Sequence, residues 1–173
     1  MQQLYIKNIC KTVIITIFAL SVFSIKANAQ SDYYRAFKVD AGFGYGSGTA
    51  AVTLEPHYRI TDIQAVGLRY QLAIANEGNA NTDYTYTSYC LTFDQYFAGQ
   101  KSYGDARFFG GVGGGIFAKN DTHNNITKNS WGFFPRLGLE AGHFRTAVDY
   151  NFTGNNFNYL QISVGFFIGG GKK

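Results

Sequence analysis

The chain is short of the residues that support several common architectures. Among its 173 residues there are only two prolines, two cysteines, one methionine and one tryptophan. Two cysteines cannot form a disulfide-dense scaffold or a metal site with several thiolate ligands. Charged residues make up only 15% of the chain and aromatic residues 17%, a composition too apolar for a disordered chain. The length suits a single domain.

The chain also lacks long apolar helices. The longest apolar run, Thr12 to Ile25 (TVIITIFALSVFSI), has 14 residues, whereas a membrane-spanning helix needs about 20. It follows Lys7 and Lys11 and precedes the small-residue motif Ala27-Asn28-Ala29. This order is typical of a secretory signal peptide. We therefore predict a cleaved signal peptide over residues 1–29 and an exported domain over residues 30–173.

The basic character of the chain belongs mostly to that leader. The full sequence carries a net charge of +4, and Lys7, Lys11 and Lys26 lie before the predicted cleavage site. Without those three lysines the net charge is +1, with no clustered basic face. Nucleic-acid binding, which needs such a face, is not expected.

Downstream of residue 30 the sequence alternates with period two and shows no convincing helical period. An uncharged, mostly apolar residue occupies every second position over residues 37–45, 52–58, 66–74, 85–95, 108–116, 131–139, 144–152 and 160–168. These forty positions include no charged residue. Such alternation predicts eight strands with two different faces.

The intervening positions are charged, polar or glycine. A soluble barrel or sandwich would point the apolar face inward, whereas a transmembrane barrel would point it toward lipid. The polar face favours the membrane barrel, because it holds one lysine, many glycines and nearly balanced charges, which suit a narrow interior. We predict an all-β, eight-stranded antiparallel up-and-down transmembrane barrel with a lumen charge network of Lys38, Asp40, Glu55, Arg59, Arg69, Asp94, Arg107, Arg136, Glu140, Arg145 and Asp149.

Aromatic residues gather near the strand ends on the apolar face. Membrane barrels carry aromatic girdles at both lipid–water interfaces. The predicted lipid-interface aromatics are Phe37, Tyr45, Tyr58, Phe108, Trp131, Phe144 and Phe152.

An even number of strands places both termini on the periplasmic side. The predicted outer loops are Gly46–Ala50, Asn76–Asp83, Ala118–Asn129 and Thr153–Asn158, and the predicted periplasmic turns are Ile60–Asp62, Ala98–Asp105 and Gly142–His143. Pro56 and Pro135 each remove a ladder hydrogen bond, and a closed barrel has no edge strand to receive them. We therefore expect a β-bulge at one or both prolines.

Three segments give the chain a family resemblance: Phe108–Phe117 (FFGGVGGGIF), Trp131–Gly142 (WGFFPRLGLEAG) and Tyr159–Ile168 (YLQISVGFFI). Together with the leader and the eight alternating strands, they resemble the outer-membrane β-barrel domain family, the small OmpA/OmpX-like, porin-superfamily barrels of Gram-negative envelopes. The resemblance implies an integral protein of the outer membrane, in contact with outer-membrane lipid and lipopolysaccharide. It also implies that the barrel-assembly machinery reads the C-terminal strand, although this chain continues past that strand as Gly169–Lys173.

No catalytic, metal or cofactor site is predicted. His57 is expected to point into the lumen, while His123 and His143 fall in predicted loops. None has the His-x-Ser spacing of the lipid A deacylases of similar shape, and the phosphate-loop pattern fails at Gly110–Gly115 because no Gly-Lys-Ser/Thr follows. Asp121, His123 and Asn124 fit a hydrated loop better than a metal site.

The expected function is non-enzymatic: a structural role, or an adhesive or interaction role at the cell surface through the outer loops, whose extracellular ligand the sequence does not identify. Three alternatives remain open. They are a narrow transport channel or export-apparatus component, a soluble periplasmic barrel that binds an apolar ligand, and a lipid-modifying enzyme.

Overall fold

The computed structural model describes residues 35–46, 48–76, 83–97, 106–121, 126–154 and 158–170. The predicted signal peptide and the loop residues between these ranges, His123 and Asn124 included, lie outside the described residues.

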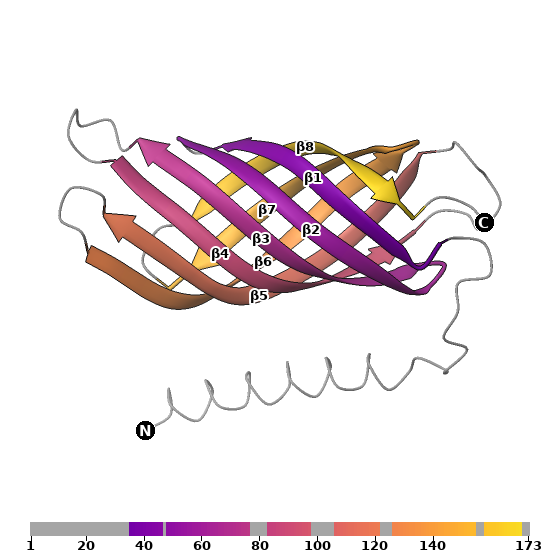
Figure 1. Cartoon of the computed structure of the whole chain (residues 1–173), viewed down its shortest axis with the longest axis horizontal. Helices are drawn as coiled ribbons and strands as arrows, with labels where there is room; N and C mark the ends of the chain where they lie inside the picture. The colour runs from indigo at the N-terminus through magenta and orange to yellow at the C-terminus, as the bar shows by residue number, and fades with distance from the viewer. Residues whose placement is uncertain are drawn as a thin grey trace, which may run out of the picture.

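Eight strands follow one another along the described chain. They are β1 (Phe37–Gly46), β2 (Thr49–Thr61), β3 (Gln64–Asn76), β4 (Asp83–Tyr96), β5 (Arg107–Asp121), β6 (Ile126–Ala141), β7 (Phe144–Thr153) and β8 (Tyr159–Gly169). Each pairs antiparallel with its neighbours in sequence, and β1 pairs with β8, which closes the barrel (Figure 1). The predicted all-β, eight-stranded antiparallel up-and-down barrel is confirmed.

The two faces of the wall are sorted as the alternation predicts. None of the forty uncharged positions is buried. The alternate charged positions are buried inside the barrel, from Lys38 and Asp94 at 0% exposure to Arg107 at 8%. Side chains alternate across a strand, so one parity of the sequence fills the lumen and the other covers the outside.

The prediction of a β-bulge at one or both prolines is wrong. Pro56 pairs with Val39, and Pro135 pairs with Val112. On the other side of each proline the pairing lapses for two residues and then resumes in the same register, between Leu54 and His57 against β3 and between Phe133 and Arg136 against β7. The long ladders on both sides of each gap hold the register. The missing N–H of each proline therefore interrupts the pairing locally, and no extra residue bulges out of the strand.

The register shift lies elsewhere, between Arg59 and Thr61 of β2. It falls beside the tight turn to β3, where an irregularity increases local twist. The strands also run further than expected at the predicted third outer loop, because β5 continues to Asp121 and β6 begins at Ile126. The first loop is shorter than Gly46–Ala50, since β2 begins at Thr49. The Gly142–His143 turn is as expected, and Gly142 has a φ of 61° that favours glycine.

The closing seam between β1 and β8 depends on a close approach of two glycines. Gly42 pairs with Gly165. A Cβ added at Gly165 would lie 2.4 Å from the Ala41 carbonyl oxygen and 2.7 Å from Gly42 Cα. Because both obstacles are backbone atoms, neither can move aside without opening the seam.

We therefore expect Gly165→Ala to lower the free energy of unfolding by about 1–3 kcal/mol, the usual cost of overpacking. Urea titration of the protein refolded into lipid vesicles measures the change. The matched control is Gly114→Ala, since a Cβ there has no atom nearer than 3.5 Å. Equal midpoints for the two variants would contradict the close-approach argument.

Candidate functional site

The interior of the barrel holds every charged residue predicted for it. All eleven side chains are buried, with residue exposures of 8% or less. They come from β1 to β7, so the charges meet across the lumen as well as along its wall. Because an unpaired buried charge is costly, the pairing between them decides whether this interior is stable.

Glu140 is the centre of one group. Lys38 Nζ donates a hydrogen bond to its Oε1, as do Arg145 Nη1 at 2.8 Å and Tyr96 Oη at 2.7 Å. Its Oε2 accepts from Arg107 Nη2 at 3.0 Å and Arg59 Nη2 at 3.5 Å. One carboxylate thus joins four cations from β1, β2, β5 and β7.

Arg136 is the centre of a second group. Its Nη1 and Nη2 donate to the two carboxylate oxygens of Glu55 at 2.9 and 2.8 Å. Its Nε and Nη2 donate to Asp94 at 2.8 and 2.9 Å. The planar guanidinium suits such two-sided binding. Arg145 connects the groups, because its Nη2 donates to Asp94 Oδ2 at 2.8 Å.

His57 is 1% exposed and lies beside the carboxylates of Asp40 and Glu55. Its Nε2 is 2.9 Å from Asp40 Oδ2 and 3.3 Å from Glu55 Oε1. Asp40 in turn lies 3.4 Å from Lys38 Nζ and 3.2 Å from Arg145 Nη1. The expected inward position of His57 is confirmed.

A separate, smaller group lies further along the lumen. Arg69 Nη1 is 3.0 Å from Asp149 Oδ2, and Arg69 donates a hydrogen bond to Gln71. Gln71 Nε2 donates to Gln161 Oε1 at 2.7 Å. In this group the amide side chains of Gln71 and Gln161 occupy places that charged side chains hold in the first two groups.

Sequence reasoning missed the aromatic part of the interior. Buried rings lie against the cations: Phe109 has Arg145 Cζ 3.9 Å from its centroid, Phe134 has Arg69 Cζ at 4.3 Å, and Phe167 has Lys38 Nζ at 4.7 Å. Cations are attracted to ring faces at such distances. These rings occupy the same alternate strand positions as the charged residues. That spacing was the sequence signal that could have placed them inside the barrel.

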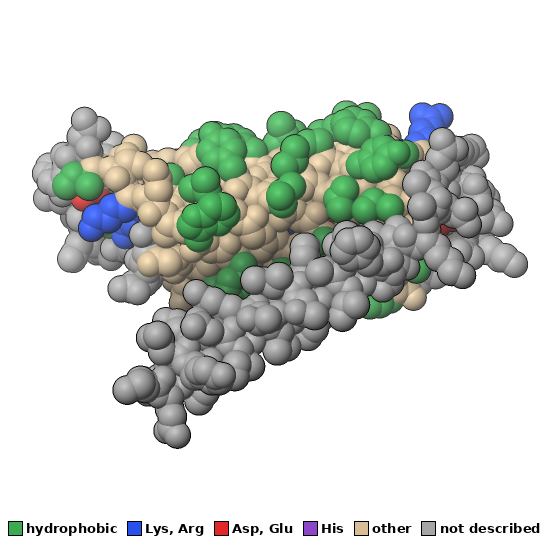
Figure 2. Space-filling view, turned by 90° about the horizontal axis from the view of Figure 1, so that it is seen from below, with side chains coloured by type: hydrophobic (Ala, Val, Ile, Leu, Met, Phe, Trp, Pro, Cys, Tyr) green, Lys and Arg blue, Asp and Glu red, His purple; other side chains and the backbone are tan. Residues whose placement is uncertain are grey.

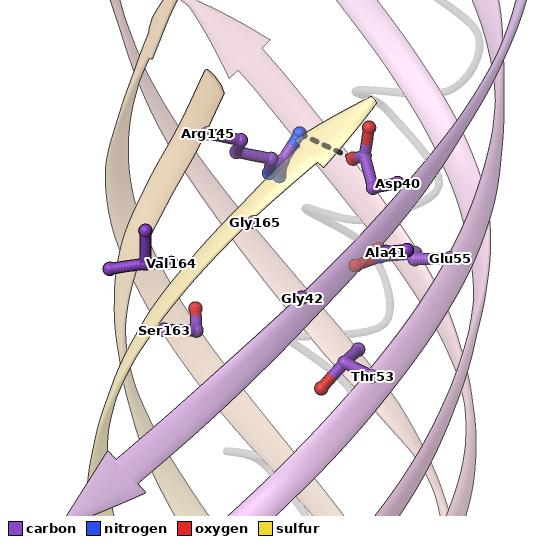
Figure 3. A pocket seen from close by; sticks show the side chains of 9 residues that line it. All are labelled: Asp40, Ala41, Gly42, Thr53, Glu55, Arg145, Ser163, Val164 and Gly165. Carbon is purple, nitrogen blue, oxygen red and sulfur yellow. Dashed lines mark ion pairs between the residues drawn. The ribbon is translucent and has the colours of Figure 1, made fainter. Parts of the chain in front are cut away.

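Figure 3 shows a small cavity beside the closing seam. It has a volume of about 40 Å³ and is lined by the polar side chains of Asp40, Thr53, Glu55, Arg145 and Ser163. The paired glycines Gly42 and Gly165 leave this space because they contribute no side chain to the lumen. A space of this size with polar side chains in its lining can hold ordered water.

The outer wall is apolar over its length. Thirty large apolar side chains of the described residues are more than a third exposed. Figure 2 shows hydrophobic side chains spread along the wall, with the prominent Lys and Arg patches at its two ends. The predicted lipid-interface aromatics all lie on this face, from Phe152 at 37% to Trp131 at 77% exposure.

Other kinds of site find no support in the described residues. They contain no group of three His, Cys, Asp or Glu residues arranged to hold a metal ion. Searched in the same way, they include no helix with the length and apolarity to cross a membrane. His143 lies at the Gly142–His143 turn, where its Nδ1 is 3.2 Å from the Phe167 carbonyl oxygen.

Comparison with known proteins identifies the fold. No family model matches the sequence, and no curated protein does. Among solved structures, Neisserial surface protein A matches with a TM-score of 0.55 and 14% identity over 80% of this chain and 97% of its own. The N-terminal β-barrel domain of Pseudomonas aeruginosa OprF matches with a TM-score of 0.52 and 14% identity over 78% and 99%. The chain thus has the fold of the small eight-stranded outer-membrane barrels, and the resemblance seen in the sequence is confirmed at the level of fold.

The position of Glu140 leads to a stability prediction. Glu140→Gln keeps the size of the side chain but leaves four buried cations without this carboxylate, so we expect it to lower the free energy of unfolding by about 3–5 kcal/mol. Urea titration in lipid vesicles measures the loss. Ser163→Ala is the control, because it removes a single long hydrogen bond from Ser163 Oγ to the Ala147 carbonyl oxygen, at 3.3 Å. Such a bond contributes about 1 kcal/mol.

A double variant separates charge pairing from packing. If Lys38 and Glu140 stabilise each other, Lys38→Met should cost less in the Glu140→Gln background than in the parent protein. Strictly additive changes would show that the pair contributes nothing beyond its separate side chains.

Proposed function

We propose that this protein is an integral outer-membrane β-barrel, exported by a cleaved signal peptide, whose polar lumen is sealed by its charge network. The observation that carries the proposal is the inverted distribution of residues. Thirty large apolar side chains face outward while eleven charged side chains are buried inside. Soluble monomers rarely expose continuous apolar surface beyond a few hundred Å², whereas a lipid-facing wall requires it.

The lengths of the strands support the same proposal. They range from 10 to 16 residues, and a tilted strand needs about 9–11 residues to cross the hydrocarbon core. A closed barrel also leaves no open sheet edge with a row of unpaired backbone groups, which the bilayer interior would not tolerate.

A sealed lumen favours a non-enzymatic role. The network joins strands from opposite sides of the barrel, and its two larger groups share Arg145. Its interior is filled with paired side chains, as in other barrels of eight strands. The remaining surface for function is the set of loops at the ends, so we assign a structural role, or adhesion through the outer loops.

The proposed partners follow from the same surfaces. Outer-membrane lipid and lipopolysaccharide would contact the apolar wall. The barrel-assembly machinery would read β8, whose outward residues Leu160, Ile162, Val164, Phe166 and Ile168 are all more than 40% exposed.

Fractionation of cells that express the full chain tests membrane insertion. We expect the protein in the outer-membrane fraction, released only by detergent, and we expect its gel mobility to change on boiling. Recovery in the soluble periplasmic fraction would overturn the proposal, because an apolar wall of this extent would then need another cover.

Planar-bilayer recording tests the sealed lumen. We expect the refolded protein to give no steady conductance, because Glu140 and Arg136 of β6 form ion pairs across the interior with Arg59 and Glu55 of β2. A general porin recorded in the same apparatus is the positive control. Steady conductance of porin size would replace the sealed barrel with the transport alternative.

A further inference from the structure

The outer wall has a hollow midway along its strands. It has a volume of about 480 Å³ and extends across β2 to β6, with Leu54, Leu68, Tyr89, Leu91, Ile116 and Trp131 among its lining residues. Its size falls in the range of about 300–1,000 Å³ seen for ligand pockets. Arg69 and Cys90 also contribute to the lining, but both are 3% exposed and belong to the lumen side of the wall.

Gly114 contributes to the hollow because it carries no side chain. It faces outward at the centre of the fifteen-residue strand β5 and pairs with Leu91 on one side and Phe133 on the other. Most of the outward positions around it carry large side chains, so the missing side chain leaves a depression between them.

Packing does not require a glycine at this position. The nearest atoms to an added Cβ are the Gly132 carbonyl oxygen at 3.5 Å and Phe133 Cβ at 3.8 Å, which is ordinary contact. At Gly115, by contrast, an added Cβ would lie 2.0 Å from the Tyr89 carbonyl oxygen. The backbone therefore explains Gly115, whereas Gly114 leaves space that the fold does not need.

The other outward glycine of β5 provides an internal comparison. At Gly110 an added Cβ would lie 3.0 Å from the Phe97 ring, so the chain covers that position with its own side chain. Among the described residues nothing covers Gly114 in the same way, and the hollow stays open to the outside.

We propose that this hollow, the Gly114 groove, binds one acyl chain of a bilayer lipid more tightly than the surrounding wall does. The proposal rests on the proposed membrane location. The groove is continuous with the apolar wall that would contact lipid, and it extends from Gly114 at the middle of β5 to Trp131, which is predicted to lie at the lipid–water interface. Its outward lining offers apolar surface and aromatic rings without a charged group, which suits a hydrocarbon chain.

Trp131 makes the proposal measurable, because it is the only tryptophan in the sequence and it lines the groove. Folded protein in dodecyl maltoside micelles is titrated with dibromo-phosphatidylcholine, whose brominated acyl chains quench tryptophan fluorescence on contact. We expect the quenching to contain a saturable component that is complete at one lipid per protein, above the gradual quenching from partition into micelles.

Gly114→Leu fills the groove at a position where a side chain is tolerated, and we expect it to abolish the saturable component. The control Val164→Leu enlarges an outward side chain on β8, a strand that contributes no lining residue to the groove, and should keep the saturable component. Identical titration curves for the parent protein and both variants would overturn the proposal.

Two further measurements on the same samples separate the possible failures. Heat-dependent gel mobility and insertion into vesicles report the membrane barrel itself, so a protein that inserts but shows no saturable quenching refutes the groove alone. Sedimentation analysis reports self-association. A dimer that Gly114→Leu dissociates, without any saturable quenching in the parent protein, would make the groove a contact between copies and overturn the lipid proposal.

Discussion

The structure depends on one constraint: charge taken into a narrow interior must be neutralised there. Glu140 illustrates how tightly this constraint acts, because its two oxygens meet Lys38, Arg59, Arg107 and Arg145. A buried ion is tolerated only when ion pairs and hydrogen bonds replace its water. The six cations and five anions of the lumen therefore need positions on seven strands that bring them together, and the register of the barrel supplies those positions.

One alternating pattern supplies both surfaces of the wall, with charged and small residues inside and apolar residues outside. Inside, small residues such as Gly42 and Gly165 make room for long arginine side chains. The cavity lies where these two glycines face each other across the β1–β8 seam. Outside, the same period presents large apolar residues. Glycine thus has two structural roles in this barrel. Gly165 permits close contact between backbones, and Gly114 leaves space on the outer surface.

Much of the fold could be predicted from the sequence, because the alternation of Lys38, Asp40, Arg136 or Glu140 with apolar residues assigns each position to a face. The pairing partners could not, since parity says which side Arg136 faces but not that Glu55 and Asp94 lie opposite it. Phe109 and Phe134 were missed because their hydrophobicity suggests lipid, whereas their position puts them under guanidinium groups. Pro56 was misread because the ladder with β1 keeps the register that one missing donor was expected to break.

The connectivity of the Glu140 cluster also bears on the order of assembly. Lys38, Arg59 and Arg107 belong to β1, β2 and β5, whereas the carboxylate that joins them is supplied by β6. A chain folded only as far as β5 would carry these cations without the counter-ion they share. The sheet is therefore expected to stay open and hydrated until β6 to β8 are in place. Closure of the barrel and pairing of the buried cations with Glu140 then occur in the same step.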